Sequence, residues 1–225
     1  MTAELRPGVW WLPQRGVNAY LVEDGDALTL VDAGMPWQAE NIRRGLEVAG
    51  YQPRDLDRVL ITHYDLDHVG GLRSLLESAG DVDVYCGARD ADILTGRRKP
   101  PLRNRKGLFH RLTGFLVPSI ESPVHSVEDG DRIGGFEAIH TPGHTVGHTA
   151  YVHEGRDAAL LGDLVRADDG ALEPSPALLS VDTDDVDASI QRVLERVPDF
   201  RAACVGHGDP LRSGGRAALA AAVER

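Results

Sequence analysis

The chain has 225 residues, of which 42% are hydrophobic, and its formal net charge is −11 at pH 7. It has enough apolar residues for a sizeable core, but no stretch approaches the ~20 consecutive apolar residues of a membrane-spanning helix. The acidic balance argues against a nucleic-acid partner, and two cysteines are too few for a disulfide framework. The first residues lack the apolar core of a signal peptide, so we expect a cytoplasmic protein.

The first 86 residues predict strands interrupted by two helices. Apolar runs at 9–13, 17–22 and 27–32, with turns at Arg15-Gly16 and Asp24-Gly25, are typical of successive antiparallel strands. Residues 37–50 have the spacing of an amphipathic helix that ends at a glycine. We then expect a strand at 58–62, a helix at 72–79 and a strand at 82–86.

The rest of the chain repeats this order after an insertion around residues 88–120. The patterns predict strands at 133–141, 149–153, 157–161 and 202–206, and helices at 184–197 and 215–224. Strands followed by helices, twice over, predict an α/β fold in which two sheets pack face to face with helices outside, a four-layer αββα sandwich. No linker-like stretch divides the chain, so residues 1–225 are predicted to form a single domain.

The densest group of chemically active residues lies in T-H-Y-D-L-D-H-V-G-G, residues 62–71. His63, Asp65, Asp67 and His68 offer imidazole and carboxylate ligands, a mixed set suited to a divalent ion such as zinc. They lie on a predicted strand-to-helix turn, where several side chains can converge. Asp67 alone could simply cap the next helix, but capping does not explain two histidines flanking two aspartates.

Three later segments each place another candidate ligand beside a glycine. They are H-T-P-G-H-T-V-G-H (140–148), A-L-L-G-D (159–163) and C-V-G-H-G (204–208), which contribute His144, His148, Asp163 and His207. His140 lies on the strand side of its turn and is interpreted as structural. The remaining histidines have no partner pattern and are interpreted as surface or packing residues: His110, His125 and His153.

This ordered series of motifs resembles the metallo-β-lactamase-fold hydrolase superfamily, including its glyoxalase II-like hydrolases. The resemblance covers nearly the whole chain, including V-N-A-Y-L-V (17–22) and L-V-D-A-G (30–34), which are similar to the family's first strands. It implies two divalent metal ions, zinc first, with manganese or iron as alternatives. The implied ligands are His63 and His144 for one ion, Asp67, His68 and His207 for the other, and Asp163 between them.

One position departs from the family's commonest cluster, His-x-His-x-Asp-His. Asp65 stands where the second histidine would be. Its carboxylate can bind the first metal directly, or it can accept a hydrogen bond from a residue that binds the metal. A carboxylate also favours harder ions such as iron or manganese.

A basic segment at 97–111 contrasts with the acidic remainder of the chain. It holds seven basic residues and no acidic one, inside the insertion at 88–120 that could form a lid over the metal rim. One interpretation is a solvated loop. The other is that Arg97, Arg98, Arg103 and Arg105 help to bind an anionic substrate.

The resemblance implies a hydrolase that uses metal-bound hydroxide on an ester, thioester, lactone or phosphoester, with a small molecule as substrate. Asp67 is the predicted catalytic residue, which orients the nucleophile and relays a proton to the leaving group. His148 could bind substrate or a ligand carboxylate, or be structural, and Asp32 is interpreted as supporting a ligand or the turn.

Two other functions remain open at this point. An iron-dependent oxidoreductase, or a persulfide dioxygenase-like enzyme, could use the same fold, since relatives with a carboxylate at the position of Asp65 include diiron enzymes. A non-catalytic binding module with a degenerate site is the third reading. The sequence does not fix the substrate or the oligomeric state, although Trp10 and Trp11 could serve a homo-oligomer interface.

Overall fold

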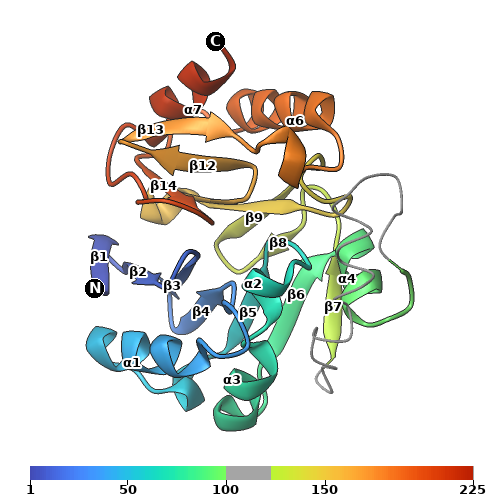
Figure 1. Cartoon of the computed structure of the whole chain (residues 1–225). Helices are drawn as coiled ribbons and strands as arrows, with labels where there is room; N and C mark the ends of the chain where they lie inside the picture. The colour runs from blue at the N-terminus through green and yellow to red at the C-terminus, as the bar shows by residue number, and fades with distance from the viewer. Residues whose placement is uncertain (100–122, 225) are drawn as a thin grey trace.

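Two β-sheets face each other in the computed structural model, which describes residues 1–99 and 123–224 (Figure 1). Within those residues the first sheet has seven strands in chain order. Its antiparallel part is followed by parallel pairing from β4 onward. The strands are β1 (Ala3–Arg6), β2 (Val9–Pro13), β3 (Asn18–Asp24), β4 (Ala27–Val31), β5 (Arg58–Ile61), β6 (Asp83–Gly87) and β7 (Val124–Val127).

The second sheet has the order β14-β11-β10-β9-β8, and a separate ribbon of β12 and β13 lies beside it. Only β11 and β14 pair in parallel in this sheet. The strands are β8 (Arg132–Ile133), β9 (Phe136–His140), β10 (Thr149–His153), β11 (Ala158–Gly162), β14 (Ala202–Val205), and, in the ribbon, β12 (Val165–Asp168) and β13 (Ala171–Pro174).

Helices cover both outer faces of this pair of sheets (Figure 1). Helices α1 (Ala39–Ala49) and α3 (Leu72–Ala79) lie against the first sheet, and α6 (Thr183–Arg196) and α7 (Gly215–Val223) lie on the side of the second. The shorter elements are α2 (Leu66–Val69), α4 (Ala88–Leu94), and the 3₁₀ turns η1 (Pro53–Asp55), η3 (Glu154–Arg156) and η4 (Ala177–Leu179).

Alternation along the strands produces three separate apolar layers. In β5, Val59 and Ile61 pack toward α1 and α3, whereas Leu60 packs between the sheets. In β11, Leu161 faces the layer under α6 and α7, whereas Leu160 faces the first sheet. Successive strand residues point to opposite faces, so each sheet fills one layer with helices and shares the central one. The predicted αββα sandwich is therefore confirmed.

The strand directions bring distant turns to one rim. Strands β4, β5 and β6 are parallel, and β11 and β14 are parallel in the other sheet. Backbone bonds join the sheets near this rim: Thr149 N donates to Thr62 O at 2.9 Å, and Asn18 N donates to Gly206 O at 2.8 Å. The turns after β5, β11 and β14 therefore meet at one end of the sandwich.

The first residues of the predicted insertion at 88–120 form a helix in the described structure. Residues 88–94 form α4, which packs into the body of the protein with Asp90, Ala91 and Leu94 buried. A helix that buries this face cannot open as a lid without exposing apolar surface. Residues 100–122, which hold most of the predicted basic segment, lie outside the described residues.

Other differences concern short elements. The patterns did not predict β1, β7 or the ribbon of β12 and β13, and the expected strand at 133–141 is divided into β8 and β9 by a turn at Gly134 and Gly135. Across residues 1–99 and 123–224, none of the helices has the length and apolar character needed to span a bilayer.

Candidate metal centre

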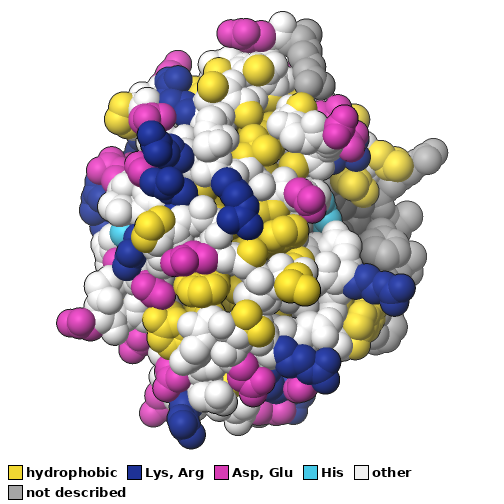
Figure 2. Space-filling view, turned by 90° about the vertical axis from the view of Figure 1, so that its left-hand side faces the viewer, with side chains coloured by type: hydrophobic (Ala, Val, Ile, Leu, Met, Phe, Trp, Pro, Cys, Tyr) yellow, Lys and Arg dark blue, Asp and Glu magenta, His cyan; other side chains and the backbone are white. Residues whose placement is uncertain are grey.

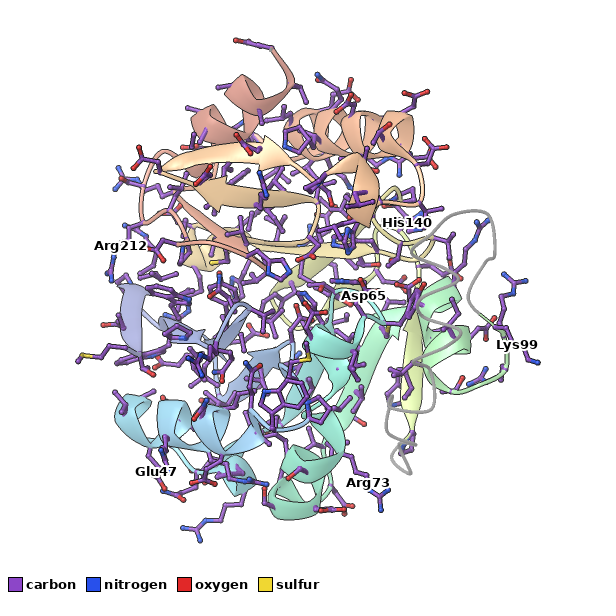
Figure 3. The ribbon with its side chains drawn as sticks, viewed as in Figure 1. Glu47, Asp65, Arg73, Lys99, His140 and Arg212 are labelled. Carbon is purple, nitrogen blue, oxygen red and sulfur yellow. The ribbon has the colours of Figure 1, made fainter. Side chains whose placement is uncertain are left out.

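The predicted ligand residues gather where the strands end at the shared rim. His63 lies two residues after β5, and Asp163 directly follows β11. Asp67 and His68 belong to α2, while His144 lies in the turn between β9 and β10. His207 comes shortly after β14. In Figure 3, Asp65 lies in the middle of the molecule, between the halves formed by the two sheets.

Three side chains form the first half of this centre. Asp65 Oδ2 lies 3.1 Å from His144 Nε2 and 3.4 Å from His63 Nε2. The two rings are nearly perpendicular, at 88°, with centroids 4.7 Å apart. One ligand atom from each residue lies within 4.8 Å of the others, and all three residues are buried. Asp65 therefore lies close enough to both histidines for the direct-ligand reading.

The second half is more open to solvent. Asp67 Oδ2 lies 3.5 Å from His207 Nε2 and 4.0 Å from His68 Nε2. The side chains of His207 and Asp67 are 33% and 27% exposed, whereas His68 is fully buried. Among the described residues, the second half is therefore the more accessible part of the centre.

Asp163 lies between the halves. Its Oδ2 is 3.1 Å from His207 Nε2, 3.3 Å from His144 Nε2 and 4.0 Å from His63 Nε2. Its Oδ1 is 3.3 Å from His68 Nε2. One carboxylate thus faces the Nε2 atoms of all four histidines, which is the placement of a bridging ligand.

A second set of contacts fixes how the rings point. Thr62 Oγ1 donates its hydrogen to Asp32 Oδ2 at 2.8 Å, so it must accept from His63 Nδ1 at 3.0 Å. His68 Nδ1 likewise donates to Asp32 Oδ2 at 2.8 Å. The hydrogen on Nδ1 leaves the lone pair of Nε2 facing the centre. Asp32, which has the unusual φ of 60°, thus supports two rings at once.

The other two rings are anchored in the same manner. His207 Nδ1 donates to the carbonyl oxygen of Gly16 at 2.6 Å, and His144 Nδ1 is hydrogen-bonded to Ser175 Oγ at 2.8 Å. All four rings are therefore held from behind before any ligand binds, which is how metal-binding histidines are usually oriented.

Burial and neighbouring charges oppose one another here. Burial, aided by His68, lowers the pKa of His63 well below its usual range, so its ring is neutral. Burial also opposes charge on His68, but Asp163 and Asp32 outweigh it and raise the pKa of His68 well above its usual range. Burial opposes the charge of Asp163 as well, yet His68 and His144 hold the pKa of Asp163 well below its usual range.

Buried polar atoms without hydrogen bonds test whether a cation fits. His63 Nε2, His68 Nε2 and Asp163 Oδ1 are buried and make no hydrogen bond. Such atoms are costly to leave unpaired, and all three face the same small volume. Imidazole nitrogens beside carboxylate oxygens match the ligand preferences of divalent zinc, iron or manganese. The residues fit a divalent metal ion.

Comparison with known proteins agrees with this geometry. The sequence model of the Metallo-beta-lactamase superfamily matches residues 12–207, a span that contains every predicted metal ligand. The chain belongs to the metallo-β-lactamase superfamily. Most members of this superfamily are hydrolytic enzymes, and its fold binds divalent metal ions through such His and Asp clusters.

Three similar proteins illustrate the range of the superfamily. The chain is 30% identical over 231 residues to the probable metallo-hydrolase YflN of Bacillus subtilis, covering 92% of this chain and 86% of that one. It is 33% identical over 199 residues to the hydroxyacylglutathione hydrolase of Ruegeria pomeroyi, covering 84% and 61%. The crystal structure of TTHA1623 in a di-iron-bound form has 30% identity and a TM-score of 0.67, covering 89% and 92%.

The surroundings of His148 do not support its predicted contact with substrate. The ring is fully buried, its Nε2 accepts a hydrogen bond from Asp163 N at 3.1 Å, and its Nδ1 is bonded to Thr141 Oγ1 at 2.8 Å. With both nitrogens engaged inside the protein, His148 orients the backbone of Asp163 and has no donor or acceptor to offer a substrate.

The predicted anion-binding arginines are only partly within the described residues. Arg97 pairs with Asp92 at 3.6 Å, and its side chain is 62% exposed. Arg98 lies four residues beyond the end of α4, while Lys99 projects away from Asp65 in Figure 3. The remaining two predicted residues lie outside the described residues: Arg103 and Arg105. On the face shown in Figure 2, acidic and basic side chains are interspersed.

A buried carboxylate that the sequence interpretation missed joins two ligand-bearing loops. Asp90 on α4 is fully buried and accepts hydrogen bonds from Tyr64 N at 3.2 Å, Thr145 Oγ1 at 2.5 Å and Gly147 N at 2.7 Å. Tyr64 lies between two first-half ligands, and Thr145 follows His144. Positions 87, 90, 91 and 94 are buried and have the spacing of one helix face, which places Asp90 on the inner face of α4.

Gly206 leaves just enough room for the bridging carboxylate. A Cβ at this position would overlap Asp163 Oδ1 and lie 2.8 Å from His68 Cε1. We therefore expect Gly206→Ala to displace Asp163 and to lower bound metal, measured by elemental analysis, well below the wild-type content. Gly155→Ala is the matched control, because its Cβ would make an ordinary 3.5 Å contact with His153. Equal metal content in the two variants would contradict this role of Gly206.

Proposed function

We propose that this chain is a binuclear metal-dependent hydrolase acting on an ester, thioester, lactone or phosphoester. The observation that carries the proposal is Asp163, whose two oxygens face Nε2 atoms from both halves of the centre. Two ligand groups that share one carboxylate are the arrangement expected for two neighbouring cations. The proposed ligands are His63, Asp65 and His144 for the first ion, Asp67, His68 and His207 for the second, and Asp163 for both.

Two divalent cations held there would act as Lewis acids and lower the pKa of a coordinated water to about 7. The chain's carboxylates set the electrostatics around them. Asp65, Asp67 and Asp163 offset three of the four positive charges that two divalent cations bring. The centre keeps a net positive charge, which favours the negative oxygen that develops on a carbonyl or phosphoryl group under attack.

Asp67 is placed to move the proton. It is the most exposed of the three carboxylates, at 27%, whereas Asp65 and Asp163 are buried. Its Oδ2 faces His207 Nε2 on the open side of the centre, where water and substrate arrive. A carboxylate there can accept a proton from the attacking water and deliver it to the leaving group. The histidines cannot share this task, because each directs Nε2 toward the centre and holds Nδ1 against the protein.

The second candidate function is iron-dependent redox chemistry, which one observation favours. Asp65 adds a carboxylate to the first half, and carboxylates shift a site toward harder ions. The 30% identical TTHA1623 was solved with two irons. Metal content separates the two functions: zinc or manganese near two per chain supports hydrolysis, while iron with a visible absorption band supports redox work.

The test of the proposal is a substrate panel on protein reconstituted with zinc, manganese or iron. Chromogenic esters, thioesters, lactones and phosphodiesters are assayed with wild type and with Asp67→Asn. We expect hydrolysis of at least one class by wild type. In Asp67→Asn we expect kcat to fall by about 10²- to 10⁴-fold, as for loss of a general acid or base. Metal content is measured on the same samples, because Asp67 is also a proposed ligand of the second ion.

The outcomes separate cleanly. Near-full activity of Asp67→Asn with both metals bound would remove the proton-transfer role. No hydrolysis of any class by wild type carrying two metals would overturn the hydrolase proposal itself.

A further inference from the structure

A pocket of about 240 Å³ opens beside the exposed half of the metal centre. Two of its walls are proposed metal ligands, so whatever fills it lies next to the reacting atoms. The other walls come from β12, from Pro176 and from η4. The lining residues are Asp163, Val165, Arg166, Pro176, Leu179 and His207.

The walls away from the ligands are mainly apolar. Val165 is 1% exposed and is anchored in the apolar layer under α6 and α7. Leu179 is 50% exposed and flanks the pocket together with Pro176. An exposed leucine beside a pocket gains apolar contact when a ligand covers it.

This apolar wall is rigidly attached to the metal centre. Ser175 N donates to Leu164 O at 3.1 Å, one residue from Asp163, and Ser175 Oγ bonds His144 Nδ1 at 2.8 Å. Leu179 N donates to Pro176 O at 2.9 Å and closes the turn that carries the leucine. The distance between the wall and the ligands is therefore fixed by the fold.

The guanidinium in the pocket is already paired. Arg166 Nη2 lies 2.8 Å from Glu173 Oε2, and Arg166 Nε donates to the same oxygen at 3.3 Å. A carboxylate that already neutralises Arg166 would compete with an anionic substrate for it. The pocket is thus better matched to an uncharged group than to an anion.

We propose that this pocket binds an uncharged, apolar acyl chain attached to the scissile carbonyl, which deepens and rests on the proposed hydrolase function. Its volume of about 240 Å³ leaves room for a short acyl chain. In the reaction, the water oxygen bonds to the acyl carbon and the bond from that carbon to the leaving oxygen or sulfur breaks. One water proton goes to the leaving group, and the acid keeps the chain.

A series of p-nitrophenyl esters tests the proposal with a pair of leucine variants. Acetate, butyrate, hexanoate and octanoate esters are compared on metal-reconstituted wild type, Leu179→Ala and Leu178→Ala. Leu178 is the matched control, because it is the neighbouring leucine in η4, is 68% exposed and does not line the pocket. We expect wild-type kcat/KM to rise by up to about fourfold per added methylene as far as hexanoate.

The variants decide the assignment. Leu179→Ala should lower the hexanoate-to-acetate ratio of kcat/KM by about fivefold, the effect of losing one partly buried leucine side chain, and Leu178→Ala should leave it unchanged. A flat chain-length profile, or equal ratios in the two variants, would overturn the pocket assignment. So would faster cleavage of the adipate monoester, whose chain ends in a carboxylate, than of the neutral hexanoate ester.

A binding measurement keeps this inference separate from the hydrolase proposal. Calorimetry with hexanoate and acetate on the same metal-loaded proteins requires no turnover. Tighter binding of hexanoate by wild type, lost in Leu179→Ala alone, supports the pocket even if every ester is left intact, in which case the hydrolase proposal fails alone. Equal affinity for the two acids rejects the pocket whether or not esters are cleaved.

Discussion

Asp163→Asn is expected to remove most of the bound metal and to lower kcat/KM by more than about 10²-fold. Changes in the residues that merely support metal ligands typically cost 10- to 100-fold, and Asp163 faces all four ligand histidines directly. An asparagine has the same size but carries no charge, so it cannot offset two cations. Elemental analysis, followed by activity on whichever substrate class the wild type cleaves, measures both effects.

Asp168→Asn provides the control for that experiment. Asp168 lies on β12, close to Asp163 in the chain, but is exposed. It should leave metal content and kcat/KM at wild-type values. Two metals retained by Asp163→Asn would show that Asp163 does not bridge the halves, and would require a different ligand set.

Asp90→Ala is expected to destabilise the protein by about 3 kcal/mol or more. It leaves the donors of Tyr64 N, Thr145 Oγ1 and Gly147 N buried without an acceptor, at about 1 to 3 kcal/mol each before relaxation. Because these donors lie in the loops that bear the first-half ligands, metal affinity should fall as well. Urea unfolding and metal titration measure the two effects. Asp92→Ala, a change on the same helix at a partly exposed carboxylate, should cost little.

The pH dependence of unfolding provides a second test of Asp90. Burial raises the pKa of Asp90 to about 7, from about 4 in the unfolded chain. Between these values the folded protein holds a proton that the unfolded chain releases, so this group's contribution to stability is greatest below pH 4 and is lost as pH rises to 7. From pH 5.5 to pH 8 the loss is about 2 kcal/mol.

Asp90→Asn removes this titration. In metal-free protein, the unfolding free energy of wild type should therefore fall between pH 5.5 and pH 8 by about 2 kcal/mol more than that of Asp90→Asn. An unchanged difference would mean that Asp90 is ionised throughout this range, with its three donors outweighing burial.

Local patterns were sufficient for much of the fold and for the residues that gather at the rim. The alternation of β5 and the glycine that ends α1 are visible in the sequence, and both reflect short-range rules. The ligand turns could also be predicted, because a histidine or aspartate beside glycine at a strand end is a local feature. The structure brings His63, Asp65, Asp67, His68, His144, Asp163 and His207 together as the motif series implied.

What could not be predicted depends on contacts across the molecule. Asp90 is one case, since it acquires its role only when α4 packs against two distant loops. His148 is another, because nothing local shows that both ring nitrogens are engaged. The ribbon of β12 and β13, by contrast, has a local signal in its turn. Asp169 and Gly170 have φ angles of 45° and 78°, as a type I′ hairpin turn requires.

The ligands of the first half come from both sheets, His63 after β5 and His144 before β10. A cation coordinated by both histidines would link the two sheets. Its affinity would therefore depend on how tightly the sheets pack against each other. A substitution that weakens the packing between the two sheets, even far from the rim, would then lower the affinity for the ion first. Metal content would thereby report whether the two sheets are fully packed against each other.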